Sequence, residues 1–352
     1  MKATNKRNQP PPILSPRPSH VRFRGGVIFF NFASISTMKR LTARLVFVIC
    51  IAFASGGLSA QTNVWQPLPG YTQLPIWPGA VPDPQPVPGP EYVTNIFTPG
   101  GASWLAIGNV SRPTMTVYSP KGKNNGVAVV VFPGGGYNCL AIDLEGTEIC
   151  DWLTSNGFTA VLLKYRVPTP IREPFRASRM ALEDAQRTLG LLRLHAAEWH
   201  IDPHKIGVIG FSAGGHMVAA TSTHFDQRSY PAVDVADNES CRPDFAIACY
   251  PGHLWDDGAD GQDFKLNPNV PVTHDTPPTF LVQAEDDHVD GVEQSLVYYL
   301  GLKKAGVPVE MHLYAQGGHG FGLRRTKFPI SEWPQLVENW LRTIGMISTN
   351  SK

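Results

Sequence analysis

The feature that most constrains the fold is a regular alternation of apolar runs and helical patterns between residues 127 and 344. The first run, residues 127–132, is continuously apolar, which is typical of a strand buried on both faces of a sheet. Similar runs follow at residues 158–163, 206–209, 245–248, 280–283 and 309–314. Apolar positions at helical spacing occur at residues 148–155, 179–194, 214–223, 291–304 and 332–344. This order predicts an α/β fold with a mostly parallel central sheet and helices on both faces.

The segments outside this alternation have a different character. Residues 61–120 are rich in Pro and Gly, with five prolines between Pro82 and Pro90. Because Pro removes a backbone donor and fixes φ, this stretch predicts an N-terminal wrap of coil and edge strands, with an early strand at 114–118. The α/β domain itself is expected over residues 121–346, followed by a short tail at 347–352.

Residues 38–60 have the pattern of a secretory signal peptide. Met38-Lys39-Arg40 precedes an apolar run at 45–54 that is short for a bilayer span, and small residues lie just before Gln61. We therefore expect a secreted or periplasmic protein without a stable membrane anchor, a permanent anchor being the alternative. Residues 1–37 are expected to be an upstream extension outside the fold, on the hypothesis that translation starts at Met38 rather than Met1.

Composition excludes some classes of partner. The formal net charge is +1, so there is no electrostatic basis for binding nucleic acid or an anionic membrane surface. Removal of residues 38–60 would leave four cysteines, which permits disulfides in an oxidising compartment. Cys241 and Cys249 could pair, but the apolar run around Cys249 favours a simple buried thiol. No cysteine or histidine spacing resembles a zinc site, and we expect neither metal nor organic cofactor.

Gly210-Phe211-Ser212-Ala213-Gly214 is a G-x-S-x-G sequence. By itself such a motif is weak, but this one follows the apolar run 206–209 and opens the helical pattern from Gly214. That is the strand–turn–helix context of a nucleophile elbow, in which the serine lies at a helix N-terminus. The pattern predicts Ser212 as a nucleophile. The alternative is an N-capping serine in a glycine-rich turn.

Phe132-Pro133-Gly134-Gly135-Gly136-Tyr137 comes directly off the first buried strand. Successive glycines allow backbone N–H groups to approach a substrate carbonyl without obstruction by a Cβ atom. We therefore expect the N–H groups of Gly135 or Gly136, together with that of Ala213, to form an oxyanion hole. The alternative is a flexible turn.

The base and the acid should follow the serine in the order Ser, acid, His. His319, in the loop between the last strand and the last helix, fits this order, whereas His216 is on the helix behind Ser212 and is expected to be structural. For the acid, Asp286 and Asp287 both follow the strand at 280–283. Asp286 is the first choice and Asp287 a close second.

Together these residues resemble the esterase branch of the α/β-hydrolase superfamily, over roughly residues 127–344. The most similar group is exported acetyl-xylan and feruloyl esterase-like proteins, related to dienelactone-hydrolase and prolyl-peptidase-like domains. The first Asp of the Asp-Asp-x-Val stretch is the acid that this resemblance implies, which is why Asp286 is preferred. Many relatives carry a Pro soon after that Val, whereas Asp290 and Gly291 follow here.

The resemblance implies an α/β-hydrolase fold and a serine esterase acting on a plant-polysaccharide-like or small acyl ester by Ser-His-Asp acyl transfer. Residues 121–346 would then be the catalytic domain. Tyr137, His288 and Trp255 are candidates for lining the substrate cleft, although an exposed aromatic residue is more often ordinary packing. A prolyl-peptidase-like peptidase and a non-catalytic carbohydrate-binding relative are the alternative functions.

Overall fold

A central sheet of eight strands organises the protein, in the order β1-β4-β7-β5-β8-β9-β12-β13. The computed structural model describes residues 64–85, 89–97, 103–167, 174–256, 258 and 263–348, without the side chains of 174–177. The strands from β7 to β13 in this order are parallel, and β1 and β4 add antiparallel strands at one edge. Their bounds are Gln73–Pro75 (β1), Thr114–Tyr118 (β4), Ala128–Phe132 (β5), Thr159–Lys164 (β7), Ile206–Phe211 (β8), Ala246–Cys249 (β9), Thr279–Ala284 (β12) and Val309–Tyr314 (β13).

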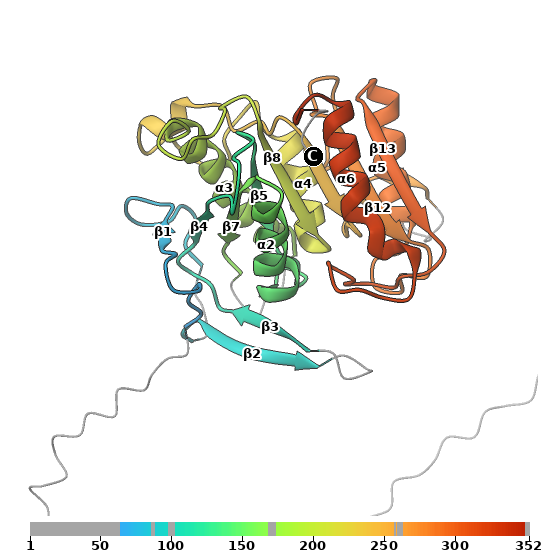
Figure 1. The fold of residues 1–352 in the computed structure, drawn as a ribbon, viewed down its shortest axis with the longest axis horizontal. Coiled ribbons are helices and arrows are strands. Elements are labelled where there is room, and N and C mark those ends of the chain that lie inside the picture. Colours follow the sequence, from blue (N-terminus) through green and yellow to red (C-terminus); the bar gives the residue numbers. More distant parts are fainter. Residues whose placement is uncertain are drawn as a thin grey trace, which may run out of the picture. The chain divides into compact units, whose positions relative to one another are not determined.

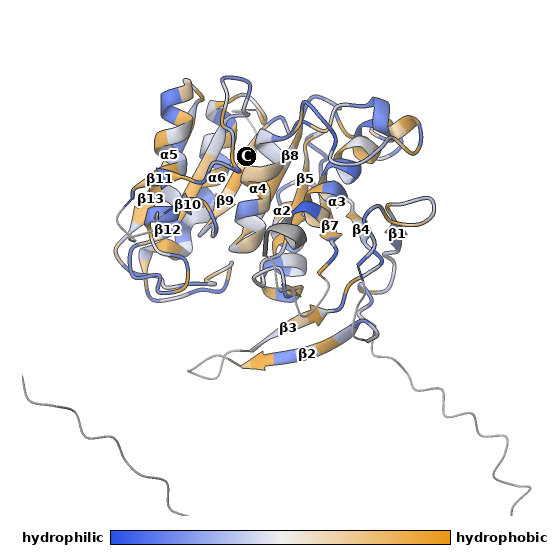
Figure 2. Ribbon diagram, turned by 180° about the vertical axis from the view of Figure 1, so that it is seen from behind, coloured by the Kyte–Doolittle hydropathy of each residue, from blue (hydrophilic) through white to orange (hydrophobic). Residues whose placement is uncertain are grey.

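The inner strands are buried along their whole length. Every residue of β5, β7, β8, β9 and β12 is buried, which explains why their sequences are mostly apolar rather than alternating. The orange colour of these strands in Figure 2 reflects this hydrophobicity. The predicted mostly parallel sheet is therefore confirmed.

Helices cover both faces of the sheet (Figures 1 and 2), with α2 and α6 on one face and α3, α4 and α5 on the other. On the first face, Trp152 of α2 and Trp333 of α6 pack edge to face with ring centroids 5.6 Å apart. The helices are Glu148–Ser155 (α2), Pro174–Leu194 (α3), Ala213–Thr223 (α4), Glu293–Ala305 (α5) and Trp333–Thr343 (α6), with short η turns at Asp143–Thr147 (η1), Val235–Asn238 (η2) and Pro329–Glu332 (η3).

The N-terminal segment contributes strands to two different sheets. Its strand β1 joins the central sheet, whereas β2 (Tyr92–Phe97) and β3 (Ser103–Gly108) form a separate antiparallel sheet with β6 (Cys139–Ala141). Figure 1 shows β2 and β3 beyond the ends of the central strands. A further small hairpin joins β10 (Trp255–Asp256) to β11 (Lys265–Leu266).

Trp77 attaches this N-terminal segment to α3. Its indole N–H donates to Asp184 Oδ1 at 2.8 Å, and the guanidinium groups of Arg166 and Arg187 lie over its ring. The Asp184 carboxylate also forms an ion pair with the Arg166 guanidinium, so these buried charges are paired. Gln61–Lys352 accordingly form one compact unit.

Two further expectations concern the cysteines and the membrane. Cys139, Cys150, Cys241 and Cys249 are all free thiols, and Cys249 is fully buried, as the apolar run around it indicated. Within the described ranges no helix has the length and apolarity to cross a bilayer. The predicted signal peptide, residues 38–60, and the extension 1–37 lie outside the described residues.

Candidate active site

Ser212 occupies a sharp turn between β8 and α4. Its backbone has φ 54° and ψ −120°, a conformation that L-residues rarely adopt. The turn is tight enough that a Cβ atom on Gly214 would overlap the carbonyl oxygen of Phe132 in the neighbouring strand. This is the strained strand-to-helix elbow that the G-x-S-x-G sequence predicts, and it presents the serine hydroxyl at the end of the sheet where the parallel strands stop.

His319 contacts the serine from the loop between β13 and α6. Its Nε2 lies 3.0 Å from Ser212 Oγ, and its Nδ1 lies 2.8 Å from Asp287 Oδ2. A carboxylate only accepts, so Nδ1 carries a proton and Nε2 is free to accept the serine proton. Three side chains far apart in sequence thus form one chain of hydrogen bonds that ends on the hydroxyl.

The acid in this chain is Asp287, so the preference for Asp286 is wrong as to which aspartate contacts His319. The Asp286 carboxylate instead accepts the backbone N–H groups of Gly317 and Gly318, each at 2.8 Å. Adjacent residues in the turn after β12 point in different directions. Asp286 supports the backbone of the histidine loop, and Asp287 holds the imidazole.

The Asp287 carboxylate is completely buried, and both of its oxygens accept hydrogen bonds. Its Oδ1 accepts the N–H groups of Val289 and Asp290, and its Oδ2 accepts Gln283 Nε2 as well as His319. Burial alone would raise the pKa of Asp287, but the hydrogen bond and charge of His319 and the two backbone donors outweigh it and lower that pKa. The carboxylate is therefore ionised beside the imidazole.

Three carboxylates act on His319. Burial tends to lower the pKa of the imidazole, but the hydrogen bond to Asp287 and the charges of Asp287, Asp290 and Glu145 raise it above its ordinary value. The protonated imidazole, which forms when His319 takes the serine proton, is thus stabilised by its surroundings.

The glycine-rich loop after β5 lies against the nucleophile. A Cβ atom on Gly134 would come within 2.9 Å of Ser212 Cβ, so only glycine permits this approach. The N–H of Gly134 donates to Glu145 Oε2 at 2.8 Å and is therefore not available to a substrate. The next N–H groups along the loop are those of Gly135 and Gly136, and Ala213 begins α4. Their role as an oxyanion hole stays a prediction.

Glu145, in η1, is a member of the site that sequence reasoning missed. It is buried beneath the glycine loop, and its second carboxylate oxygen accepts the Tyr250 hydroxyl at 2.9 Å. Tyr250 in turn accepts the N–H of Gly322 at 3.3 Å and packs its ring against His319. Burial raises the pKa of Glu145, opposed by these hydrogen bonds. One carboxyl thereby connects the glycine loop with the histidine loop, and no local pattern marks it.

Asp290 also lies at the nucleophile. Its Oδ2 is 3.3 Å from Ser212 Oγ and 3.9 Å from His319 Nε2. Burial raises the pKa of Asp290, opposed mainly by the charges of His319 and His253. The only signal in the sequence is the departure noted above, Asp290-Gly291 where many relatives carry a Pro.

Tyr137 does not line an open cleft, which contradicts the expectation for it. Only 1% of the residue is exposed, and its hydroxyl is 2.6 Å from His216 Nδ1. His216 is itself buried, and burial lowers its pKa to about 3, so it is neutral and structural as predicted. The two side chains form a buried pair behind the elbow rather than a binding surface.

The other two residues proposed for the cleft are placed differently. His288 is exposed in the loop that carries Asp287. Trp255 is partly exposed in β10, and its indole N–H donates to the carbonyl of Asp263. In the described part of the chain, neither forms a hydrogen bond or ion pair with Ser212 or His319, and substrate contact by either stays a prediction.

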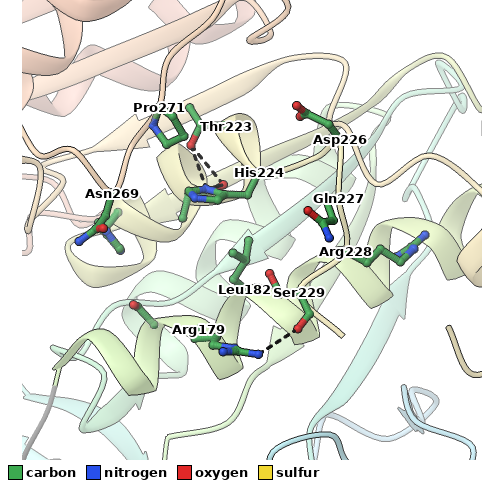
Figure 3. A pocket seen from close by; sticks show the side chains of 13 residues that line it. Arg179, Leu182, Thr223, His224, Asp226, Gln227, Arg228, Ser229, Asn269 and Pro271 are labelled. Carbon is green, nitrogen blue, oxygen red and sulfur yellow. Dashed lines mark hydrogen bonds between the residues drawn. The ribbon is translucent and has the colours of Figure 1, made fainter. Parts of the chain in front are cut away.

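A surface cavity of about 670 Å³ runs along α4, from His216 to His224 (Figure 3). Polar side chains of α3 and of the segment after α4 line much of it, among them Arg179, whose guanidinium donates to the carbonyl of Ser229. Ser212, Asp287 and His319 are not part of its lining. The cavity is therefore separate from the hydrogen-bonded chain that could perform chemistry.

Known proteins are similar to this chain in sequence. A family model described as "alpha/beta hydrolase fold" matches residues 129–323, more than half of the chain. An acetylxylan esterase of Xylanibacter ruminicola is 29% identical in an alignment of 259 residues, and the match covers 68% of this chain and 50% of that protein. Endo-1,4-beta-xylanase B of Butyrivibrio fibrisolvens is 30% identical in an alignment of 225 residues, and the match covers 58% of this chain and 34% of that protein. The chain thus spans half or less of the length of these two relatives.

A solved structure is similar over most of both chains. It is an acetyl ester-xyloside bifunctional hydrolase from Caldicellulosiruptor lactoaceticus, 33% identical, with a TM-score of 0.62. The similarity covers 79% of this chain and 97% of that one. A thermophilic esterase from Thermogutta terrifontis, 23% identical with a TM-score of 0.57, shares the fold.

Proposed function

Because the chain belongs to the α/β-hydrolase family, we propose that it is a serine carboxylesterase that hydrolyses acyl esters, acetyl esters in particular. The observation that carries this proposal is the hydrogen-bonded chain from Ser212 Oγ through His319 to Asp287, with distances of 3.0 and 2.8 Å. A serine hydroxyl is a weak nucleophile until an adjacent base takes its proton, and this geometry supplies the base and the group that orients it.

The reaction would proceed by two acyl transfers. His319 Nε2 accepts the hydroxyl proton as Ser212 attacks the ester carbonyl, and the ionised Asp287 stabilises the imidazolium. The N–H of Ala213 and one from Gly135 or Gly136 hold the tetrahedral oxyanion. The protonated His319 then gives its proton to the leaving alcohol. Water repeats the sequence and releases the acyl group from Ser212.

The substrate class we propose is an acetylated plant polysaccharide such as xylan. The similar proteins support this class, since they are an acetylxylan esterase, a xylanase and an acetyl ester-xyloside hydrolase. The 33% identity over nearly the whole of the last of these gives it the most weight. We also propose that the protein is exported, on the pattern of residues 38–60.

Acetate release from acetylated xylan tests the function, with Ser212→Ala as the control. We expect release by the wild type and none by the variant, whose fold should persist because the alanine side chain fits the same space. Labelling of the wild type by a fluorophosphonate would confirm a reactive serine and exclude a non-catalytic carbohydrate-binding protein. Hydrolysis of aryl acetates without release from xylan would keep the serine esterase and refute the polysaccharide substrate. Turnover by Ser212→Ala would refute the nucleophile.

A further inference from the structure

Asp290 places a second carboxylate at the reacting atoms, one that acyl transfer by Ser212, His319 and Asp287 does not require. Its Oδ2 lies 3.3 Å from Ser212 Oγ and 3.9 Å from His319 Nε2. Asp287, in contrast, contacts the imidazole from its opposite edge, at Nδ1. Asp290 therefore faces the side of the site where the substrate must bind.

Hydrogen bonds on both sides hold the backbone of Asp290 in place. The N–H of Asp290 donates to Asp287 Oδ1 at 3.0 Å, and its carbonyl accepts Gln283 Nε2 at 3.0 Å. Gly252 packs against the carboxylate so closely that a Cβ atom there would lie 2.6 Å from Asp290 Oδ1. The side chain is 17% exposed, and Oδ1 has no hydrogen-bond or ion-pair partner among the residues that the structure describes. The carboxylate thus keeps acceptor capacity beside the nucleophile and is partly accessible.

The geometry assigns this acceptor to the alcohol side of the ester. The leaving oxygen must come within hydrogen-bond reach of His319 Nε2, about 2.6–3.2 Å, to receive its proton. Asp290 Oδ2 is only 3.9 Å from that nitrogen. Substituents of the alcohol that lie close to the ester oxygen therefore come near the Asp290 carboxylate. We propose that Asp290 selects esters whose alcohol carries a hydroxyl group on the carbon next to the one that bears the ester oxygen. This proposal rests on the proposed esterase function.

A hydroxyl donor suits this position better than a larger cation. Asp290 Oδ2 already accepts the Ser212 hydroxyl and lies near His319, and Oδ1 lies against Gly252, so a ligand approaches the carboxylate in a restricted space. A hydroxyl group brings one donor to this space, whereas an ammonium group has three donors to satisfy. An alcohol that bears a carboxylate would be repelled by Asp290. Monoesters of vicinal diols, the form in which acetyl groups occur on sugar rings, have the required donor.

The test compares two acetates that differ by one hydroxyl, trans-2-hydroxycyclohexyl acetate and cyclohexyl acetate. Migration of the acetyl group in the first regenerates the same compound, so the substrate stays defined. The readout is the ratio of kcat/KM values for the two esters in the wild type, Asp290→Asn and Asp290→Ala. Glu285→Gln, which removes an exposed carboxylate from the same loop, is the matched control.

A hydrogen bond to a charged group predicts a ratio of about 10–100 in the wild type. The ratio should fall to near 1 in Asp290→Ala, take an intermediate value in Asp290→Asn and persist in Glu285→Gln. A merely structural Asp290 would slow both esters equally and leave the ratio unchanged, and that result overturns the proposal, as does a wild-type ratio near 1. Absence of hydrolysis of every ester would instead refute the esterase function itself.

Discussion

Replacing Asp287 with asparagine tests the assignment of the acid most directly. Four donors surround this carboxylate, two at each oxygen: the N–H groups of Val289 and Asp290 at Oδ1, and Gln283 Nε2 and His319 Nδ1 at Oδ2. An asparagine side chain has one oxygen and one NH₂ group. In either orientation, two of these donors would face the NH₂ group instead of an acceptor.

The structure indicates which orientation the asparagine adopts and what it costs. Turning the NH₂ group toward Val289 and Asp290 would leave two backbone N–H groups without acceptors, at about 1–3 kcal/mol each. Turning it toward His319 is easier because the imidazole can move its proton to Nε2 and accept at Nδ1. His319 then cannot accept the proton of Ser212. We therefore expect kcat to fall about 10³–10⁴-fold, equivalent to about 4–5.5 kcal/mol of transition-state stabilisation.

The assay is hydrolysis of an aryl acetate, with Asp286→Asn as the matched variant one residue away. Asp286 is partly exposed, and its Oδ1 alone accepts Gly317 and Gly318, so an asparagine oxygen can keep both bonds. We expect this variant to lose less than about tenfold in kcat/KM, because its charge-assisted bonds only become neutral ones. Thermal unfolding of both proteins checks that each is folded. A larger loss in folded Asp286→Asn than in Asp287→Asn would refute the assignment.

Two further predictions concern the pH profile and the glycine loop. The pKa of His319 is raised and the base must be neutral, so kcat/KM should rise with pH around a midpoint above the ordinary pKa of a histidine side chain. Asp290→Asn should shift that midpoint downward, because it removes one of the three nearby negative charges, the others being Asp287 and Glu145; an unchanged midpoint in that variant would contradict this. Glu145→Ala leaves the Gly134 N–H and the Tyr250 hydroxyl without their partner, so kcat should fall about 10–100-fold with little change in KM. Glu145→Gln can form hydrogen bonds with both groups and should recover most of the lost kcat. Equal losses in the two variants would show that hydrogen bonding is not the cause.

The parts of this protein that could be predicted from sequence are those determined by neighbouring residues. A strand buried on both faces must be apolar throughout, so β5 and β8 were located to within two residues at either end. The elbow at Ser212 needs glycines at fixed offsets, and His319 lies in a loop defined by the elements on either side of it. Each of these features is visible within a short window of the chain.

Choosing between Asp286 and Asp287 required information of another kind. Both are acidic, both follow β12, and the turn that separates them directs one toward backbone N–H groups and the other toward His319. Tyr137 was misjudged for a related reason, since its partner His216 lies 79 residues away and buries it. Glu145 likewise derives its position from Gly134 and Tyr250, contacts that no local pattern reveals.

The placement of these carboxylates has a consequence for the base. Asp287 bonds His319 directly, whereas Asp290 and Glu145 act on it only through their charges, and together they raise its pKa. A higher pKa makes the imidazole a stronger acceptor for the Ser212 proton but leaves less of it neutral in acid. Removing Asp290 or Glu145 should therefore shift activity toward lower pH and weaken proton acceptance at high pH. Of the two, only Asp290 is also within hydrogen-bond distance of Ser212, so it alone should alter the choice of ester as well as the pH profile.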